Sequence, residues 1–155
     1  MTALPVVGAS AETSRARAIR RILLATDLSA ASDVATAHAV ELARDLRAEL
    51  IVVSVIDPST HQPGPALARL DQRRAAHELA AQALVLSGRR AGVSIHFLVW
   101  EGDPGPAIVE AAIAEQVDLV VVGSHGRNRV ERLVLGSVSD HVVRNAPCPV
   151  LIARA

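Results

Sequence analysis

The sequence contains no lysine and no tyrosine, and only one cysteine, one tryptophan and one phenylalanine among 155 residues. All sixteen basic side chains are therefore arginines. Enzymes that transfer phosphoryl groups rapidly place a lysine, from a P-loop or from a kinase strand, over the phosphates of ATP. A chain without lysine has neither, so the composition argues against a kinase or a fast ATPase.

A disulfide framework is excluded as well, because Cys148 has no second cysteine to pair with. A lone cysteine fits a reducing compartment, and we expect a cytoplasmic protein. Cys148 stands between two prolines at the expected start of a strand. A small buried hydrophobic side chain is a better interpretation of it than a redox centre.

An excess of charge and long apolar runs are also missing. Sixteen basic residues balance sixteen acidic ones, which favours neither nucleic acid nor an anionic membrane surface as the partner. The longest apolar runs have the length of strands, short of the roughly 18 residues of a membrane span. No apolar stretch near the N-terminus is long enough for a secretory signal. We expect a small molecule or another protein as the partner.

The residues that are present suit one globular domain. Half of them are hydrophobic, enough to fill one core in a chain of this length. Residues 1–18 are rich in Ala, Ser and Thr without a sustained period, and we expect a flexible tail there. Residues 19–155 then form the single domain, without an internal repeat.

Short apolar runs alternate with helical patterns over this domain. Strands are predicted at 22–25, 50–56, 93–99, 119–122 and 149–153, and helices at 31–48, between the second and third strands, from 104 onward and at 137–145. Strands and helices that alternate in this way form a parallel sheet with helices on both faces and right-handed crossovers. The sequence therefore predicts an α/β fold with an open, doubly wound sheet.

The helices and strand ends carry further signals. Apolar residues share one face in the first helix (Ala35, Ala39, Leu42, Leu46) and in the second (Ala76, Leu79, Ala83, Leu86). Gly88 or Gly92 can end the second helix, and Asp103 can cap the third, with Pro104 at its first position. Pro149 cannot donate to a neighbouring strand, so the last strand is expected at a sheet edge, where it could pair with a second copy.

Candidate site residues follow from the place of the strand ends. In open sheets of this class ligands bind beyond the carboxyl ends of the strands, where the strand order reverses. The two candidate ends are residues 25–27, after the first strand, and residues 123–126, after the fourth. Gly123 and Gly126 lack a Cβ, so the backbone can turn sharply there and approach a ligand closely.

A second half of the candidate site is the helix that Gly136 and Ser137 open. Its first N–H groups have no internal partner and carry the positive end of the helix dipole, which favours phosphate. Ser137 and Ser139 add hydroxyl donors. The alternative is that the glycines only make turns and that Ser137 with Asp140 forms a capping box.

The joint spacing Gly123-x2-Gly126-x9-Gly136-Ser137 resembles the nucleotide-binding motif of the universal stress protein family. The resemblance runs from residue 20 to residue 153. Matching flanks are the first strand (22–27), the second strand (53–57), the start of the third helix (102–104) and the last strand (147–151).

This resemblance implies a five-stranded sheet of order 3-2-1-4-5, a homodimer through the fifth strands, and a site for ATP or another adenine nucleotide with Mg²⁺. The residues that carry over are Ala25, Thr26, Asp27 and Val55 at the base and ribose; Gly123, Ser124, His125, Gly126, Arg127, Asn128 and Arg129 around the phosphates and sugar; and Gly136, Ser137, Val138 and Ser139 as phosphate donors. Ala25 departs from a frequent proline and Ser54 from a frequent histidine. Neither departure removes a phosphate donor.

Several of these residues have a plainer interpretation. Asp27 can bind the ribose or a metal ion, or it can simply begin a helix. His125 has no partner specified by the sequence, so we interpret it as a hydrogen-bonding residue rather than a general acid or base. Arg127 and Arg129 can contact phosphates or belong to a solvated face. No catalytic residue is assigned, and the histidines show no metal-ligand spacing.

Three functions are compatible with this site. The first is a nucleotide-responsive regulator in the stress response, which needs a phosphate cradle, a base pocket and a surface that changes with occupancy. The second is a slow ATP hydrolase, in which Mg²⁺ supplies the charge that lysine would supply. The third is a dimeric scaffold that binds no nucleotide. The intact glycine spacing favours the first.

Overall fold

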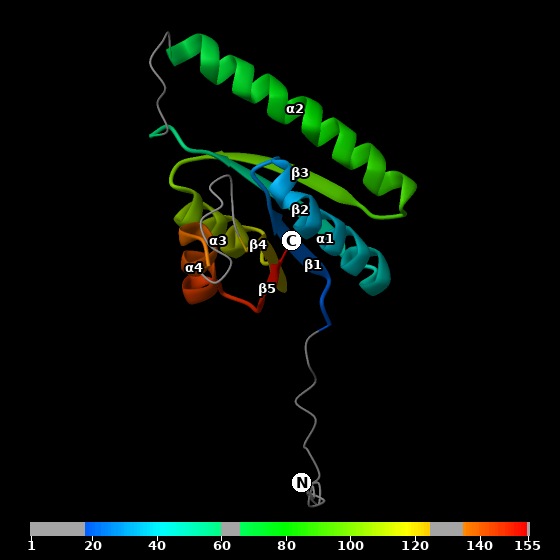
Figure 1. Ribbon diagram of the computed structural model, residues 1–155. Helices are drawn as coiled ribbons and strands as arrows, with labels where there is room; N and C mark the ends of the chain where they lie inside the picture. Colours follow the sequence, from blue (N-terminus) through cyan, green and yellow to red (C-terminus); the bar gives the residue numbers. More distant parts are fainter. Residues whose placement is uncertain (1–17, 60–65, 125–134, 155) are drawn as a thin grey trace, which may run out of the picture.

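The computed structural model describes residues 18–59, 66–124 and 135–154, and the side chains of residues 66–70 are outside this description. The predicted tail, apart from Ala18, lies outside the described residues. The elements are β1 (Arg21–Ala25), the 3₁₀ turn η1 (Ala30–Ser32), α1 (Asp33–Leu46), β2 (Glu49–Ile56), α2 (Ala66–Arg90), β3 (Ile95–Glu101), α3 (Pro104–Ala114), β4 (Leu119–Gly123), α4 (Ser137–Asn145) and β5 (Val150–Ala153) (Figure 1).

The five strands form one parallel sheet in the order β3-β2-β1-β4-β5, as expected. Helices α1 and α2 lie on one face, and α3 and α4 lie on the other (Figure 1). The chain leaves β1 toward one edge and then crosses to β4 on the other side of β1. The strand order therefore reverses between β1 and β4, where sheets of this class bind ligands.

The core consists of two layers, one on each face of the sheet. Ile22 and Leu24 pack toward α1 and α2, whereas Leu23 packs toward α3 and α4, and all three side chains are fully buried. A strand covered on both faces needs an uninterrupted apolar run, because successive side chains point to opposite faces. The run in β1 therefore exists because the strand is at the centre of the sheet.

Strand β5 lies at a sheet edge, which confirms the expectation from Pro149. The Pro149 carbonyl accepts a 3.0 Å hydrogen bond from the Val120 N–H, so the proline joins the sheet on the side where no donor is required. Strand β3 lies at the other edge, and its side chains are only partly buried after Ile95. Val93 is buried but precedes β3, which begins at Ile95.

The predicted face of the first helix is partly wrong. Ala35 and Ala39 are buried, but the third buried position is Ala43, and Leu46 is 45% exposed. The helix ends at Leu46 because Arg47 adopts a left-handed conformation with φ of 54°. Small residues at the contact let α1 lie close to the sheet, and Leu46 in the last turn lies outside this buried contact.

Helix α2 packs through the side opposite to the predicted apolar face. Leu84 and Val85 pack against the core, and a Cβ at Gly88 would clash with the Ile95 side chain, so the helix meets β3 closely at this glycine. Leu79 and Leu86 are exposed. The helix ends at Arg90, and Gly92, with φ of 74°, makes the turn that follows.

Pro104 occupies the first turn of α3 and Asp103 precedes it as N-cap residue, although the Asp103 side chain makes no capping hydrogen bond. Within the described part of the chain, no helix has both the length and the apolar character needed to cross a membrane.

Candidate functional site

A pocket lies where β1 and β4 end side by side, with Leu24 in register with Val121. Its volume is about 120 Å³, less than the roughly 300–1,000 Å³ of a pocket that encloses a whole ligand. It is lined by Ala25, Thr26, Asp27, Ser32, Val53, Val55, Pro104, Ile108, Val122, Gly123, Val138 and Ser139. The structure thus brings together the two strand ends that the sequence singled out.

The loop after β1 forms one polar wall of the pocket. The hydroxyls of Thr26 and Ser32 lie 2.8 Å apart, and Thr26 Oγ1 also accepts a 3.0 Å hydrogen bond from the Leu28 N–H. The backbone N–H of Thr26 donates to the Val53 carbonyl at 3.0 Å, which ties the loop to β2. Both hydroxyl residues are buried. The wall is therefore fixed in place before any ligand arrives.

Asp27 is half-buried in the same wall. Its Oδ1 accepts hydrogen bonds from the Ser29 N–H at 3.0 Å and from the Ser29 hydroxyl at 2.6 Å. This is an Asx turn, which orients the carboxylate at the rim of the pocket. The plainer interpretation of Asp27 as a helix cap is wrong, because the residues that precede η1 and α1 are Ser29 and Ser32.

The opposite wall is the first turn of α4, which is held against the end of β4. The Ser139 hydroxyl donates to the Gly123 carbonyl at 2.7 Å. The Gly136 N–H donates to the Ser124 carbonyl at 3.0 Å, and the Ser124 N–H donates to Ala153 at 2.8 Å. The start of α4 is thus attached to both β4 and β5.

The first N–H groups of α4 lie at the pocket and are not used by the helix itself. The bond from the Asp140 N–H to the Gly136 carbonyl, at 2.8 Å, is the first one of the helical pattern. The N–H groups of Ser137, Val138 and Ser139 precede it and have no partner inside the helix. Val138 and Ser139 line the pocket, so the positive end of the helix dipole lies beside it.

The capping-box alternative for α4 is wrong. Gly136 is the N-cap residue, with φ of −60° and ψ of 153°, and Ser137 is already the first helical residue. The Asp140 carboxylate accepts a 2.9 Å hydrogen bond from Arg144 instead of turning back to the helix start. The Ser139 hydroxyl donates its proton to the Gly123 carbonyl, so the donor that Ser139 still offers at the pocket is its N–H.

The floor of the pocket is apolar and includes residues that the sequence did not reveal. Ala25 and Val55 were expected, whereas Val53, Pro104, Ile108 and Val122 of the floor, and Ser32 of the polar wall, were not. Val53 could have been predicted from the sequence, because it is two residues before Val55 and so points to the same face of β2. Pro104 and Ile108 come from α3, and no local signal connects that helix with β1.

The remaining predicted site residues, His125, Gly126, Arg127, Asn128 and Arg129, lie outside the described residues. Cys148 is partly buried; burial, with a smaller effect of Asp118, raises the pKa of its thiol, in keeping with a packing role. The described ranges hold no cluster of three or more His, Cys, Asp or Glu residues suited to a metal ion.

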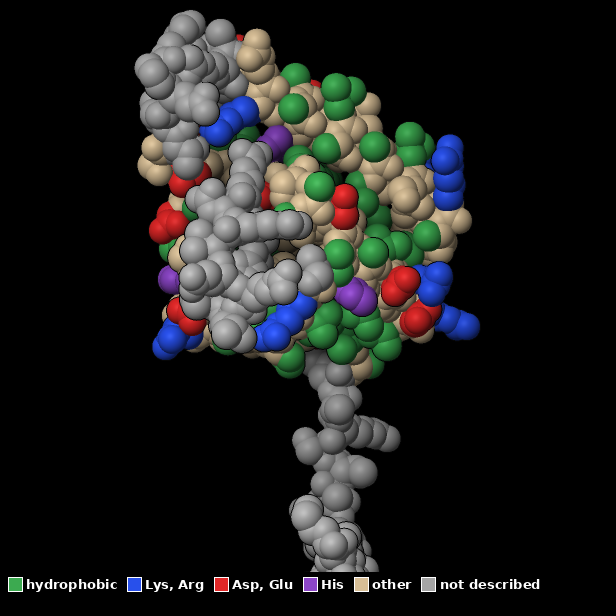
Figure 2. All heavy atoms as spheres, viewed as in Figure 1, with side chains coloured by type: hydrophobic (Ala, Val, Ile, Leu, Met, Phe, Trp, Pro, Cys, Tyr) green, Lys and Arg blue, Asp and Glu red, His purple; other side chains and the backbone are tan. Residues whose placement is uncertain are grey.

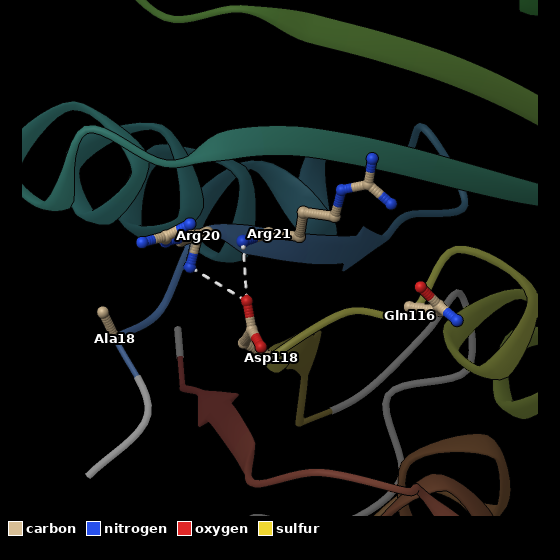
Figure 3. Close-up of a pocket in the computed structure, with 5 residues that line it drawn as sticks. All are labelled: Ala18, Arg20, Arg21, Gln116 and Asp118. Atoms are coloured by element: carbon tan, nitrogen blue, oxygen red, sulfur yellow. Dashed lines mark hydrogen bonds between the residues drawn. The ribbon is translucent and has the colours of Figure 1, made fainter. Parts of the chain in front are cut away.

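A larger hollow of about 470 Å³ lies at the amino ends of the strands, lined by Ala18, Arg20, Arg21, Gln116 and Asp118 (Figure 3). Asp118 Oδ2 accepts hydrogen bonds from the Arg20 and Arg21 N–H groups at 2.9 and 3.1 Å. The Arg21 guanidinium donates to the Glu115 carbonyl at 2.9 Å. These bonds join β1 to the turn before β4, so we interpret the polar groups here as structural.

Comparisons with known proteins agree with the fold and with the family resemblance. A protein of Thermus aquaticus described as a universal stress protein is 39% identical over 140 residues, which cover 87% of this chain and 98% of that protein. The universal stress protein UspA from Lactobacillus plantarum has a TM-score of 0.77 at 27% identity, over 88% of this chain and 98% of that one.

A second solved structure, of a universal stress protein in complex with cAMP, has a TM-score of 0.68 at 27% identity. It covers 88% of this chain and 98% of that one. The model of the universal stress protein family matches residues 18–154, which includes every described element. The chain belongs to the universal stress protein family.

Proposed function

We propose that this protein binds an adenine nucleotide in the pocket between β1, β4 and α4 and acts as a nucleotide-responsive regulator in the stress response. The observation that carries the proposal is the position of the α4 N-terminus beside an apolar pocket at the point where the strand order reverses. An apolar cavity suits a flat base, and an adjacent helix start suits phosphate.

Each wall of the pocket suits a different part of the nucleotide. The side chains of Val55, Ile108 and Val122 give the base an apolar surface, and the Asp27 carboxylate at the rim can accept a hydrogen bond from a ribose hydroxyl. The phosphates then reach the N–H groups of residues 137–139. The cAMP complex of a related protein supports an adenine ligand for this family member.

ATP with Mg²⁺ is the form we propose for the bound nucleotide. The cation would be held by the phosphate oxygens, with Asp27 as the nearby carboxylate, as is usual for a Mg²⁺ that arrives with its nucleotide. The absence of lysine over the phosphates favours retention of ATP over rapid turnover. Slow hydrolysis is the alternative, and it is compatible with the same geometry.

We also propose that the protein is a cytoplasmic homodimer through β5. This strand is at a sheet edge, and two exposed apolar side chains, Leu151 and Val143, lie on β5 and the adjacent α4. A sheet edge flanked by apolar side chains is suited to strand pairing with a second copy.

The nucleotide is tested first by release and identification. Denaturation of the purified protein should release an adenine nucleotide that mass spectrometry identifies, and calorimetry should detect binding of ATP, AMP or cAMP. If neither experiment detects a nucleotide, the scaffold function replaces the proposed one.

The site is tested by a substitution that fills the pocket. Ala25→Leu adds a branched side chain at the wall, and we expect at least about a tenfold loss of ATP affinity because the base loses its space. Ala114→Leu adds the same atoms at an exposed position of α3, away from the pocket, and should leave affinity unchanged. Equal affinity for the Ala25→Leu protein and the wild type would reject this pocket as the base site.

A further inference from the structure

Helix α2 presents an exposed apolar stripe to solvent. Leu79 and Leu86 are 69% and 54% exposed, and Ala76 and Ala83 on the same side are also exposed. These residues recur at spacings of three, four and three, which is the heptad pattern of a helix that packs against another helix. Figure 2 shows hydrophobic side chains gathered along the upper margin of the molecule, where α2 runs.

Among the described residues, no part of the core packs against the stripe. The opposite side of α2 supplies the contacts with the sheet, through Leu84, Val85 and Gly88 near Ile95. A surface helix normally has one apolar side, which faces its own core, and a polar side toward solvent. Because α2 is apolar on both sides, its outer stripe is suited to an interaction with another molecule.

We propose that this stripe pairs with the same stripe of a second copy of this chain, with the two α2 helices antiparallel. The stripe alternates alanine and leucine. An antiparallel pair centred between Leu79 and Ala83 places Leu79 of each copy against position 83 of the other copy, which is an alanine. Ala76 is likewise set against the leucine at position 86 of the second copy. A large side chain then meets a small one along the seam, which lets the helices approach closely.

The charges at the two ends of α2 favour the antiparallel direction. Asp71 lies toward the start of the helix, and Arg89 and Arg90 lie at its end. The neighbouring arginines at the start interact with their own chain, because Arg74 is ion-paired with Glu101 and Arg73 acts on Asp57. In an antiparallel pair the carboxylate of each copy is near the guanidinium groups of the other. In a parallel pair the arginines would face one another. The antiparallel arrangement has two-fold symmetry, in which each copy contributes the same surface, and it sets the helix dipoles in opposition.

The α2 surface and the β5 edge can be used at the same time. Helix α2 packs on β3, and β3 and β5 are the two opposite edges of the sheet. A pair through α2 is therefore a second interface, independent of the dimer proposed above and of nucleotide binding.

The interface is tested by the mass of the full chain in solution, from light scattering and sedimentation over a concentration series. The double variant Leu79→Glu with Leu86→Glu puts two carboxylates in each copy of the seam. We expect the assembly mass to fall to that of the dimer held by β5 and the dissociation constant of the α2 pair to rise at least about tenfold, because buried like charges oppose pairing. Leu46→Glu, at an exposed leucine of α1, is the matched control and should have the wild-type mass.

Leu151→Arg separates this interface from the one at β5. If the wild type uses both interfaces, each set of substitutions alone reduces the assembly to a dimer, and their combination gives a monomer. An unchanged mass for the Leu79→Glu, Leu86→Glu protein, or an equal decrease for Leu46→Glu, would overturn the α2 pair. A monomeric wild type would overturn it as well. Circular dichroism verifies that each variant is folded.

The direction of the pair is tested by cross-linking in a Cys148→Ser background. The antiparallel seam brings Gln72 of one copy near Arg90 of the other, so a mixture of Gln72→Cys and Arg90→Cys proteins should form a mixed disulfide with a mild oxidant. Gln72→Cys alone should not cross-link, because 18 residues at 1.5 Å each separate the two thiols by about 27 Å. Cross-linking of Gln72→Cys alone would overturn the antiparallel arrangement.

Discussion

The Ser139 hydroxyl donates a 2.7 Å hydrogen bond to the Gly123 carbonyl. These residues are in the first turn of α4 and at the end of β4, so this bond fixes the helix start relative to the strand end. Ser139 is buried and its N–H belongs to the proposed phosphate site. The geometry of the site therefore depends on a side chain that does not need to touch the ligand through its hydroxyl.

Replacement of Ser139 by alanine should weaken both the fold and the site. The loss of one part-buried hydrogen bond costs about 1 kcal/mol of unfolding free energy, and it leaves the Gly123 carbonyl without this donor. ATP affinity should fall several-fold, because the α4 start is less well positioned. Ser87→Ala removes an exposed hydroxyl from α2, away from the pocket, and is the matched control. Urea denaturation and calorimetry measure the two effects, and equal behaviour of both variants would contradict the prediction.

Replacement of Gly105 is predicted to destabilise the fold, because α3 packs closely against α4 at this residue. An ideal Cβ at this position would lie 2.9 Å from Cγ of His141. Gly105→Ala should lower the unfolding free energy by about 1–3 kcal/mol through overpacking, reduced by the better helix propensity of alanine. His141→Ala removes the ring that is struck, so the double variant should recover part of the loss. A strictly additive double-mutant cycle would show that the two residues do not interact.

Ser54 is predicted to be dispensable for stability. Its side chain is fully buried in β2, and within the described structure its hydroxyl has no hydrogen-bond partner. A buried hydroxyl without a partner carries a desolvation cost of about 1–3 kcal/mol, so Ser54→Ala should leave the urea midpoint unchanged or raise it.

Ser32→Ala provides the contrast, because the Ser32 hydroxyl is bonded to both Thr26 Oγ1 and the Ser29 carbonyl, at 2.8 and 2.7 Å. It should lower the unfolding free energy by about 1–3 kcal/mol. A larger loss from Ser54→Ala than from Ser32→Ala would contradict the assignment of Ser54.

The lowered pKa of Asp57 predicts how its contribution to folding stability depends on pH. Hydrogen bonds from Ser59, with a smaller effect of Arg73, hold the pKa of the Asp57 carboxyl below its ordinary value of 3.8. Because the folded pKa is the lower one, the stabilisation is present above pH 3.8 and is lost as the pH falls through the folded pKa. Ser59→Ala should move the Asp57 pKa back toward 3.8, which a carbon-detected NMR titration of the carboxyl measures. An unchanged titration would contradict the role of Ser59.

Much of the fold was determined by the sequence itself. Apolar runs specify the strands, because a parallel strand covered on both faces tolerates few polar residues, and Pro149 places the last strand at an edge because it has no N–H to donate. The predicted bounds of α4, 137–145, agree with the structure. The order of the strands came from the family resemblance, since periodicity contains no information on which strands are neighbours.

Only the tertiary structure decided which residues share the pocket and which side of α2 is buried. Pro104 and Ile108 reach the pocket because the third crossover carries α3 across the sheet, and nothing in their local sequence specifies that contact. In α2 the sequence predicts an apolar side through Leu79 and Leu86, but that side is exposed and the helix docks at Gly88. Helical period identifies which residues share a face, whereas close approach of the helix to β3 decides which face is buried.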